Sequence, residues 1–179
     1  MIFGVFNVTM SMKGVDFMLC QFSFKNFKSY KDETVFDMQA ANLPEFAENI
    51  IYCKPASNLL PVAAIYGPNG GGKTNMLQAL TCLISTVVKP ICDMEKTRTK
   101  LIVQQKVSCT PFLFDEKTSN EPTEFLLYFR TNGYEYRYYL SMLHDEIIAE
   151  ALDRKKIGGK RTAHIFDREG KVIILGSSI

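Results

Sequence analysis

The stretch VAAIYGPNGGGKTN, residues 62–75, decides how the rest of the chain is interpreted. Its central part, GPNGGGKT at residues 67–74, matches the P-loop pattern G-x-x-x-x-G-K-[ST] at every fixed position. Glycines let the backbone adopt a positive φ and pass close to a phosphate group without a Cβ clash. Successive backbone amides then point inward and form a nest for an anion. The pattern therefore predicts a loop that binds the phosphates of a nucleotide.

Each polar residue type in this loop has a predicted role. The ammonium group of Lys73 can reach β- and γ-phosphate oxygens, so Lys73 is the predicted catalytic residue, and the Thr74 hydroxyl is the predicted Mg²⁺ ligand. The alternative is a flexible glycine-rich loop with an exposed lysine. The predicted nucleotide-binding residues of the loop are Gly67, Pro68, Asn69, Gly70, Gly71, Gly72, Lys73, Thr74 and Asn75.

The segments on either side have the patterns that such a loop requires. Residues 62–66 (VAAIY) are a short apolar run, typical of a strand buried on both faces of a parallel sheet. Residues 73–88 carry apolar side chains at three- and four-residue spacing, which predicts an amphipathic helix that Pro90 ends. The helix adds its positive N-terminal end to the phosphate site. These segments form a strand–loop–helix unit and predict the α/β class.

Further from the loop, the sequence predicts antiparallel strands. Residues 18–24 and 34–38 read as a hairpin, and residues 42–58 as a loop with one helical turn. Residues 1–17 are interpreted as an N-terminal extension, with an edge strand as the alternative. Residues 124–130 and 134–140 flank Asn132-Gly133, a strong hairpin signal. Residues 146–153, 163–168 and 172–175 continue this antiparallel meander.

Composition excludes several classes of protein. Apolar residues make up 46% of the 179 residues and charged residues 22%, which excludes a disordered chain. The formal net charge of +2 does not indicate a bulk nucleic-acid coat. No apolar run approaches the roughly 18 residues of a membrane helix, so no membrane partner is expected. The five cysteines are widely spaced without a signal peptide, which predicts reduced thiols in a cytoplasmic protein, and no zinc site is expected.

Three further features have alternative interpretations. FLFDE at residues 112–116 resembles a Walker B strand, with Asp115 on Mg²⁺ and Glu116 beside the attacking water, but the polar residues after it favour a surface turn. His144 and His164 have no acidic or cysteine partner at ligand spacing and are interpreted as structural. A basic cluster surrounds Gly158-Gly159 and is interpreted as a solvated hairpin tip, or as a contact to nucleic-acid phosphates. The cluster consists of Arg154, Lys155, Lys156, Lys160 and Arg161.

Four segments together resemble the opening of bacterial AAA-type, ABC-like ATPases, the group related to the RecF, SMC and OLD-nuclease heads. They are residues 19–36 (with NFKS at 26–29), 65–80, 111–129 and 134–140. The resemblance runs from about residue 18 to the C-terminus. It implies an ATP-binding N-terminal lobe of a P-loop NTPase head over residues 18–179, with an antiparallel β-subdomain at about 111–179.

The resemblance also implies roles for residues outside the loop. Lys28 and Ser29 of the NFKS segment are expected near the nucleotide, and Gln104 or Gln105 near the metal or water. In the family, the equivalent of residues 111–116 begins the antiparallel sheet and is not the Walker B element. The expected cofactors are ATP and Mg²⁺.

This chain departs from the family in having no signature motif and no convincing Walker B element. We therefore expect ATP binding, with hydrolysis only when a C-terminal lobe is supplied in cis or in trans. A head-to-head homodimer and contacts to DNA or a nuclease effector are expected partners by analogy. The alternatives are a non-catalytic nucleotide-sensing or interaction module, a degenerate remnant, or a nucleotide kinase.

Overall fold

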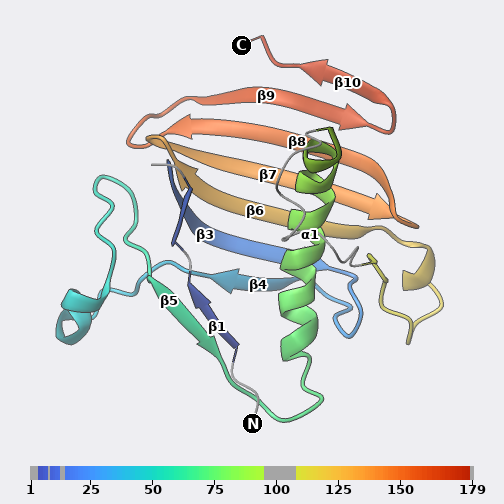
Figure 1. Cartoon of the computed structure of the whole chain (residues 1–179), viewed down its shortest axis with the longest axis horizontal. Helices are drawn as coiled ribbons and strands as arrows, with labels where there is room; N and C mark the ends of the chain where they lie inside the picture. Colours follow the sequence, from blue (N-terminus) through green and yellow to red (C-terminus); the bar gives the residue numbers. More distant parts are fainter. Residues whose placement is uncertain (1–3, 8, 13–14, 95–107, 178–179) are drawn as a thin grey trace.

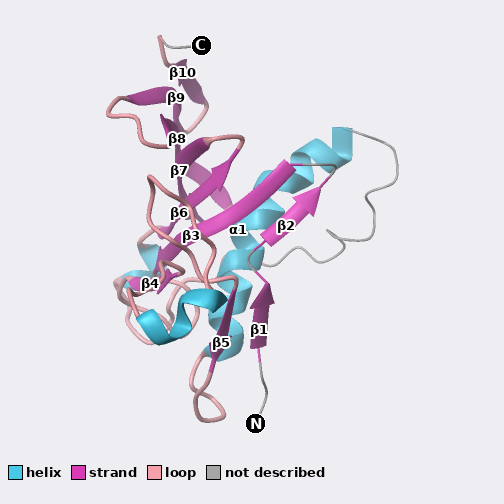
Figure 2. Cartoon of the chain, turned by 90° about the vertical axis from the view of Figure 1, so that its left-hand side faces the viewer, coloured by secondary structure: helices cyan, strands magenta, loops and turns pink. Residues whose placement is uncertain are grey.

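The computed structural model describes residues 4–7, 9–12, 15–94 and 108–177, which form two antiparallel sheets and one long helix (Figure 1). The larger sheet has eight strands and the smaller has two. Helix α1 lies across one face of the larger sheet, as the side view shows (Figure 2). The elements are β1 (Gly4–Asn7), β2 (Thr9–Met12), β3 (Val15–Lys25), β4 (Thr34–Asp37), η1 (Pro44–Asn49), β5 (Val62–Ile65), α1 (Lys73–Met94), η2 (Thr118–Asn120), β6 (Thr123–Thr131), β7 (Tyr134–Leu143), β8 (Glu146–Lys156), β9 (Thr162–Glu169) and β10 (Val172–Leu175).

The predicted meander is confirmed, and β6 to β10 pair in chain order. Asn132 (φ 51°) and Gly133 (φ 76°) make the two-residue turn between β6 and β7, where both positions need a positive φ. The next turn uses His144 (φ 51°) and Asp145 (φ 65°) in the same way, without a glycine to signal it. Tight turns fix the register, so Arg130 lies opposite Glu135.

The predicted hairpin of β3 and β4 is also confirmed, with Phe22 opposite Phe36. The hairpin does not form a unit apart from the meander, because β3 pairs with β6 over most of its length. Phe22 lies opposite Leu127, for example, and both side chains are buried. The antiparallel sheet therefore begins near the N-terminus, well before residue 111.

Residues 4–7 and 9–12 form strands, which favours the edge-strand alternative. β2 pairs with β3 at the edge of the large sheet, and β1 pairs with β5. The prediction of a β5 strand buried on both faces of a parallel sheet is wrong. β5 pairs antiparallel with β1, and Val62 is 46% exposed. Burial on both faces needs a neighbour on each side and a layer on each face, whereas β1 is the single sheet partner of β5 within the described ranges.

Helix α1 begins at Lys73 as predicted but continues to Met94, so the prediction that Pro90 ends it is wrong. A proline inside a helix removes one backbone hydrogen bond and adds a steric clash, at a cost of about 3 kcal/mol. Packing of the preceding turns offsets that cost, since Ala79, Cys82 and Leu83 are buried in the main core. The sheet contributes the other core residues, among them Phe22, Phe24, Phe125 and Leu140.

The prediction of reduced thiols is wrong for two of the cysteines. Cys82 of α1 and Cys109 form a disulfide, with their Cα atoms 6.4 Å apart. The fold brings these buried residues together across 27 positions, which their spacing in the sequence could not reveal. Cys20 and Cys53 are free, and burial raises the pKa of the Cys20 thiol to about 12.

In the part of the chain that the structure describes, no helix is long and apolar enough to cross a membrane.

Candidate functional site

The glycine-rich loop joins the end of β5 to the start of α1. Gly70 and Gly72 both have φ +83°, with Gly71 between them outside the left-handed region. Alternation of this kind turns neighbouring amides toward one side of the backbone. The Gly71 amide donates to the Pro68 carbonyl (3.1 Å), and the helical hydrogen bonds begin with the Met76 amide donating to Gly72 (3.1 Å). The loop therefore leads directly into a helix N-terminus, where four amides lack intrahelical partners.

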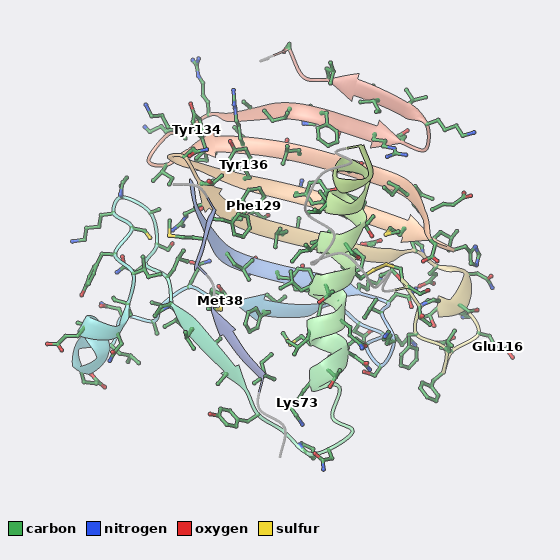
Figure 3. The ribbon with its side chains drawn as sticks, viewed as in Figure 1. Met38, Lys73, Glu116, Phe129, Tyr134 and Tyr136 are labelled. Carbon is green, nitrogen blue, oxygen red and sulfur yellow. A yellow bond between two sulfur atoms is a disulfide. The ribbon has the colours of Figure 1, made fainter. Side chains whose placement is uncertain are left out.

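Lys73 folds back over this loop at the start of α1 (Figure 3). Its Nζ donates to the carbonyl oxygens of Gly67 and Pro68, both at 2.7 Å. These acceptors carry only partial charges, whereas a phosphate oxygen carries much of a full negative charge. A phosphate group in the loop would therefore form the stronger, charge-assisted hydrogen bonds with the same ammonium group.

The loop and the first turn of α1 line an open cavity of ≈ 250 Å³. Residues 69–75 line it, so the backbone amides, the Lys73 side chain and the exposed Thr74 hydroxyl share one space. Mg²⁺ prefers oxygen ligands, and the hydroxyl at this position of a P-loop is one of the groups that bind it. The donor set thus fits a phosphate group with its metal ion.

The turn after β3 packs against the loop and brings Lys28 and Ser29 to the first turns of α1. Ser29 Oγ accepts a hydrogen bond from Asn75 Nδ2 (2.8 Å), and Lys28 Nζ donates to Gln78 Oε1 (2.6 Å). A Cβ on Gly72 would lie 3.0 Å from the Tyr30 hydroxyl. The position therefore demands glycine for two reasons, a positive φ and the close approach of a neighbouring turn.

The same turn is held from its other side by Asn26, which is buried with φ 54°. Its Nδ2 donates to the Thr118 carbonyl (2.8 Å) and its Oδ1 accepts from the Phe112 amide (2.9 Å). The Lys28 amide donates to the Thr110 carbonyl (2.9 Å). Segment 110–118 thus fixes the turn that contacts the P-loop helix.

Two residues of this region were not predicted. Gln78 lies four residues after Thr74, so helical periodicity would have placed it one turn along the same face. Tyr30 follows Ser29 directly, but it belongs to no recognisable sequence motif. Burial of its phenol group raises the Tyr30 pKa. Contact between Tyr30 and Gly72 depends on tertiary packing and had no sequence signal.

The structure favours a surface turn for residues 112–116 over a Walker B strand, because this segment forms no strand. Asp115 Oδ2 pairs with Lys31 Nζ (2.7 Å), which lowers the pKa of Asp115 and raises that of Lys31. Glu116 lies well away from Lys73 (Figure 3). Gln104 and Gln105, predicted near the metal, fall outside the described residues.

His164 has two acidic partners in the fold, Asp153 on the paired strand β8 and Asp167 three residues further along its own strand. Its Nδ1 lies 2.8 Å from Asp153 Oδ1 and its Nε2 lies 2.9 Å from Asp167 Oδ2. The hydrogen bond with Asp153 is the main cause of a raised His164 pKa. His144 is exposed in a turn. Within the described ranges, no group of three histidine, cysteine or acidic side chains has the arrangement of a metal site.

Comparison with known proteins gives one match. Residues 62–165 match a family described as "AAA domain, putative AbiEii toxin, Type IV TA system". The matched range starts at β5 and includes the glycine-rich loop, α1 and most of the meander. No curated protein and no solved structure matches the chain.

Proposed function

The chain belongs to this AAA-domain family of AAA/ABC-like ATPases, which have the P-loop NTPase fold, and on that premise we propose that GPNGGGKT is a Walker A loop that binds ATP with Mg²⁺. The observation that carries the proposal is the position of Lys73. Its ammonium group lies on the carbonyls of Gly67 and Pro68, between a positive-φ glycine loop and a helix N-terminus. A cation, free amides and the helix dipole therefore converge on one cavity.

Each residue has a defined task in this proposal. Amides of residues 69–74 surround the phosphates, and Lys73 exchanges its two carbonyl acceptors for β- and γ-phosphate oxygens. The Thr74 hydroxyl would hold Mg²⁺, and the metal ion would supply positive charge beside the phosphates. Ser29 fixes the orientation of Asn75, and Lys28 adds a positive charge one turn further along α1.

We propose that ATP hydrolysis requires a second lobe in cis or in trans, or a second copy of the chain. Phosphoryl transfer needs a positioned water and charge stabilisation along the transfer coordinate. Asp115, the acidic candidate in the sequence, is instead paired with Lys31 in a surface turn. An apolar edge supports a further partner: the four residues of β10 are between 59% and 69% exposed. Such edges bind other strands. A nuclease effector stays a prediction by analogy.

Calorimetry of ATP–Mg²⁺ binding tests the proposal. Lys73→Ala removes charge-assisted hydrogen bonds, so affinity should fall by about ten- to a hundredfold. Lys171→Ala is the matched control, because Lys171 is exposed in the turn before β10 and its loss changes net charge equally. The control should bind like the wild type. Folded wild-type protein that releases no binding heat contradicts the proposal.

Turnover of ATP by the purified chain separates binding from catalysis. We expect tight binding with little or no hydrolysis, since the groups that position water belong to the proposed partner. Brisk hydrolysis that Lys73→Ala abolishes would show that the site is complete by itself. The sensing-module alternative predicts no hydrolysis even when a second lobe is added.

A further inference from the structure

The Cys82–Cys109 disulfide joins the P-loop helix to a segment that lies on the far side of the NFKS turn, the turn after β3 that contains residues 26–29. Cys82 lies in α1, the helix that begins at Lys73. Cys109 lies in segment 108–117, which forms neither helix nor strand. The disulfide is therefore a covalent link between the helix of the nucleotide site and an irregular segment of the chain.

Segment 108–117 in turn holds the NFKS turn. The Lys28 amide donates to the carbonyl of Thr110 (2.9 Å), the residue directly after Cys109. The Phe112 amide donates to Asn26 Oδ1 (2.9 Å). The position of the NFKS turn therefore depends on where the residues just after Cys109 lie.

The NFKS turn carries this restraint to the start of α1. Ser29 Oγ accepts a hydrogen bond from Asn75 Nδ2 (2.8 Å), and Lys28 Nζ donates to Gln78 Oε1 (2.6 Å). Cys82 follows Gln78 one turn further along the same helix. The contacts thus close a ring, from α1 through the disulfide and segment 108–117 to the NFKS turn and back to α1.

We propose that the Cys82–Cys109 pair is a redox switch of nucleotide affinity, which rests on the proposed binding of ATP with Mg²⁺ at the P-loop. In the oxidised protein the disulfide holds the NFKS turn on the P-loop helix, so the loop is arranged for the nucleotide. In the reduced protein hydrogen bonds and packing alone hold segment 108–117, and ATP binds more weakly.

The redox step is a thiol–disulfide exchange. Reduction by a dithiol breaks the S–S bond, and two electrons and two protons pass from the dithiol to the two cysteine sulfurs. The pair becomes two thiols, and the dithiol closes to its own disulfide. Glutathione disulfide reverses the step, because it takes up the two electrons and two protons and becomes two glutathione thiols.

Both sulfurs are shielded from solvent, so reduction needs a local opening. Cys82 is 0% exposed and Cys109 is 6% exposed. Cys109 directly follows the exposed Ser108, and its sulfur lies 3.6 Å from the Met142 sulfur. Irregular segments open at a lower free-energy cost than the core elements on which they pack. The Cys109 side of the bond is therefore the side that a reductant reaches while α1 stays folded.

The coupling works in both directions. A disulfide that tightens nucleotide binding is itself favoured by bound nucleotide, and by the same factor. We expect a factor of about five, at the lower end of the usual range for coupled sites. The factor is small because other contacts hold the segment in both redox states, among them the hydrogen bond from the Cys109 amide to Asp145 Oδ1 (3.1 Å).

Calorimetry of the two redox states tests the first direction. A variant with Cys20→Ala, Cys53→Ala and Cys92→Ala isolates the pair, because Cys82 and Cys109 are then the only cysteines of the sequence. The variant and the wild type are titrated with ATP–Mg²⁺ after oxidation by glutathione disulfide and after reduction by dithiothreitol. Mass spectrometry of alkylated samples establishes the redox state. The dissociation constant should be about fivefold higher in the reduced protein.

The redox equilibrium in glutathione buffers tests the second direction. Saturating ATP–Mg²⁺ should shift the equilibrium constant toward the disulfide by the same factor of about five. Lys73→Ala in the same background is the control, because weakened nucleotide binding should remove the shift. A variant with Cys82→Ala and Cys109→Ala should bind ATP like the reduced protein and should not respond to either redox reagent.

Three results overturn the switch. Equal ATP affinity of the oxidised and the reduced protein would show that the disulfide does not act on the site, and would leave the P-loop proposal intact. A bond that dithiothreitol reduces only when the protein unfolds would make the pair a structural cross-link. Absence of ATP binding in both redox states would overturn the switch together with the P-loop proposal.

Discussion

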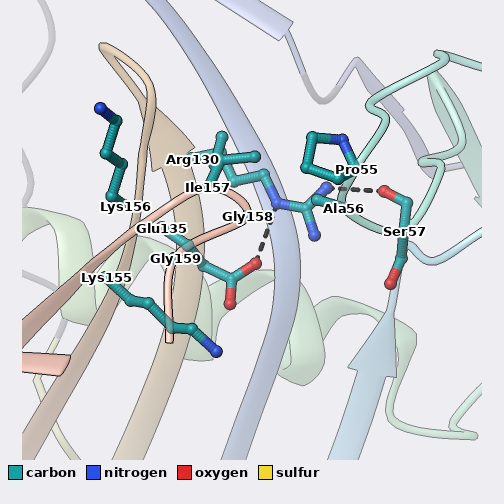
Figure 4. Close-up of a pocket in the computed structure, with 10 residues that line it drawn as sticks. All are labelled: Pro55, Ala56, Ser57, Arg130, Glu135, Lys155, Lys156, Ile157, Gly158 and Gly159. Carbon is teal, nitrogen blue, oxygen red and sulfur yellow. Dashed lines mark hydrogen bonds and ion pairs between the residues drawn. The ribbon is translucent and has the colours of Figure 1, made fainter. Parts of the chain in front are cut away.

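The P-loop cavity (≈ 250 Å³) and a second cavity beside Arg130 (≈ 280 Å³; Figure 4), which residues 55–57, 130, 135 and 155–159 line, have similar volumes, yet the chain builds them in opposite ways. The P-loop cavity comes from seven consecutive residues, and backbone amides supply most of its donors. The Arg130 cavity comes from three separate segments, and side chains supply its charge. The difference concerns what holds each site: local backbone geometry for one, and sheet register with loop packing for the other. Mutations in the P-loop should therefore change ligand binding with little change in stability, whereas mutations of Arg130 should change stability.

The largest effect on stability is expected from Arg130→Met. Removing the guanidinium leaves Glu135 and the Ser57 carbonyl without their partner, and breaking a buried pair costs several kcal/mol. Because Glu135 is about a third exposed, we expect a loss of about 2–3 kcal/mol in the free energy of unfolding. Urea denaturation measures it.

Lys73→Ala is the comparison variant for that experiment. The Lys73 ammonium group donates to carbonyls of an exposed loop, so loss of this side chain should change the free energy of unfolding by less than about 0.5 kcal/mol. Equal losses of stability in the two variants would contradict the contrast between the sites.

The contrast also explains how much could be predicted. GPNGGGKT signals its conformation within eight residues, and Asn132-Gly133 signals a hairpin within two, so both were predicted from local chemistry. The predictions were wrong where contacts between residues far apart in the sequence determine the structure. β5 pairs with β1 in place of a parallel neighbour, and α1 passes Pro90.

The Arg130 site lay between these extremes. The turn at Asn132-Gly133 fixes Arg130 opposite Glu135, so the ion pair follows from the sequence once the hairpin is accepted. The contact to Ser57 does not follow, because a loop of the earlier part of the chain supplies it. The Cys82–Cys109 disulfide could not be predicted for the same reason.

A pair of glycine variants sharpens the account of the P-loop at a smaller scale. Gly70 and Gly72 share φ +83°, but a Cβ on Gly70 meets open space and one on Gly72 meets Tyr30 and Ser29. Gly70→Ala should cost about 1 kcal/mol for the left-handed backbone alone. Gly72→Ala should cost more and should also weaken ATP binding, because the NFKS turn must move. Equal unfolding free energies would show that the turn does not press on the loop.

A still smaller effect is expected from Ser29→Ala, which removes one exposed hydrogen bond to Asn75. The unfolding free energy should fall by about 0.5–1 kcal/mol. ATP affinity should fall with it if the orientation of Asn75 matters to the loop. Ser119→Ala is the control, since Ser119 Oγ donates to a nearby carbonyl in a turn far along the chain. An affinity that Ser29→Ala leaves unchanged would limit the NFKS turn to a packing role.

The smallest effect concerns pH and tests whether strand register alone can create a charged site. Arg137, Asp153 and His164 form the row next to Arg130, Glu135 and Lys155 on the same face of the sheet. Asp153 and Asp167 raise the His164 pKa in the folded state above its ordinary value near 6.5. Protonated His164 therefore stabilises the folded state fully below about pH 6.5, and this stabilisation is lost as pH rises through the raised pKa of His164. His164→Gln should flatten the pH dependence of unfolding over that window, whereas His144→Asn, which preserves a positive-φ turn position, should leave it unchanged. An unfolding free energy of the wild type that does not change from pH 6 upward would mean that solvent screens the exposed His164 imidazole. In that case the sheet would provide an effective charge only where it also buries the charged side chain, as it does at Arg130.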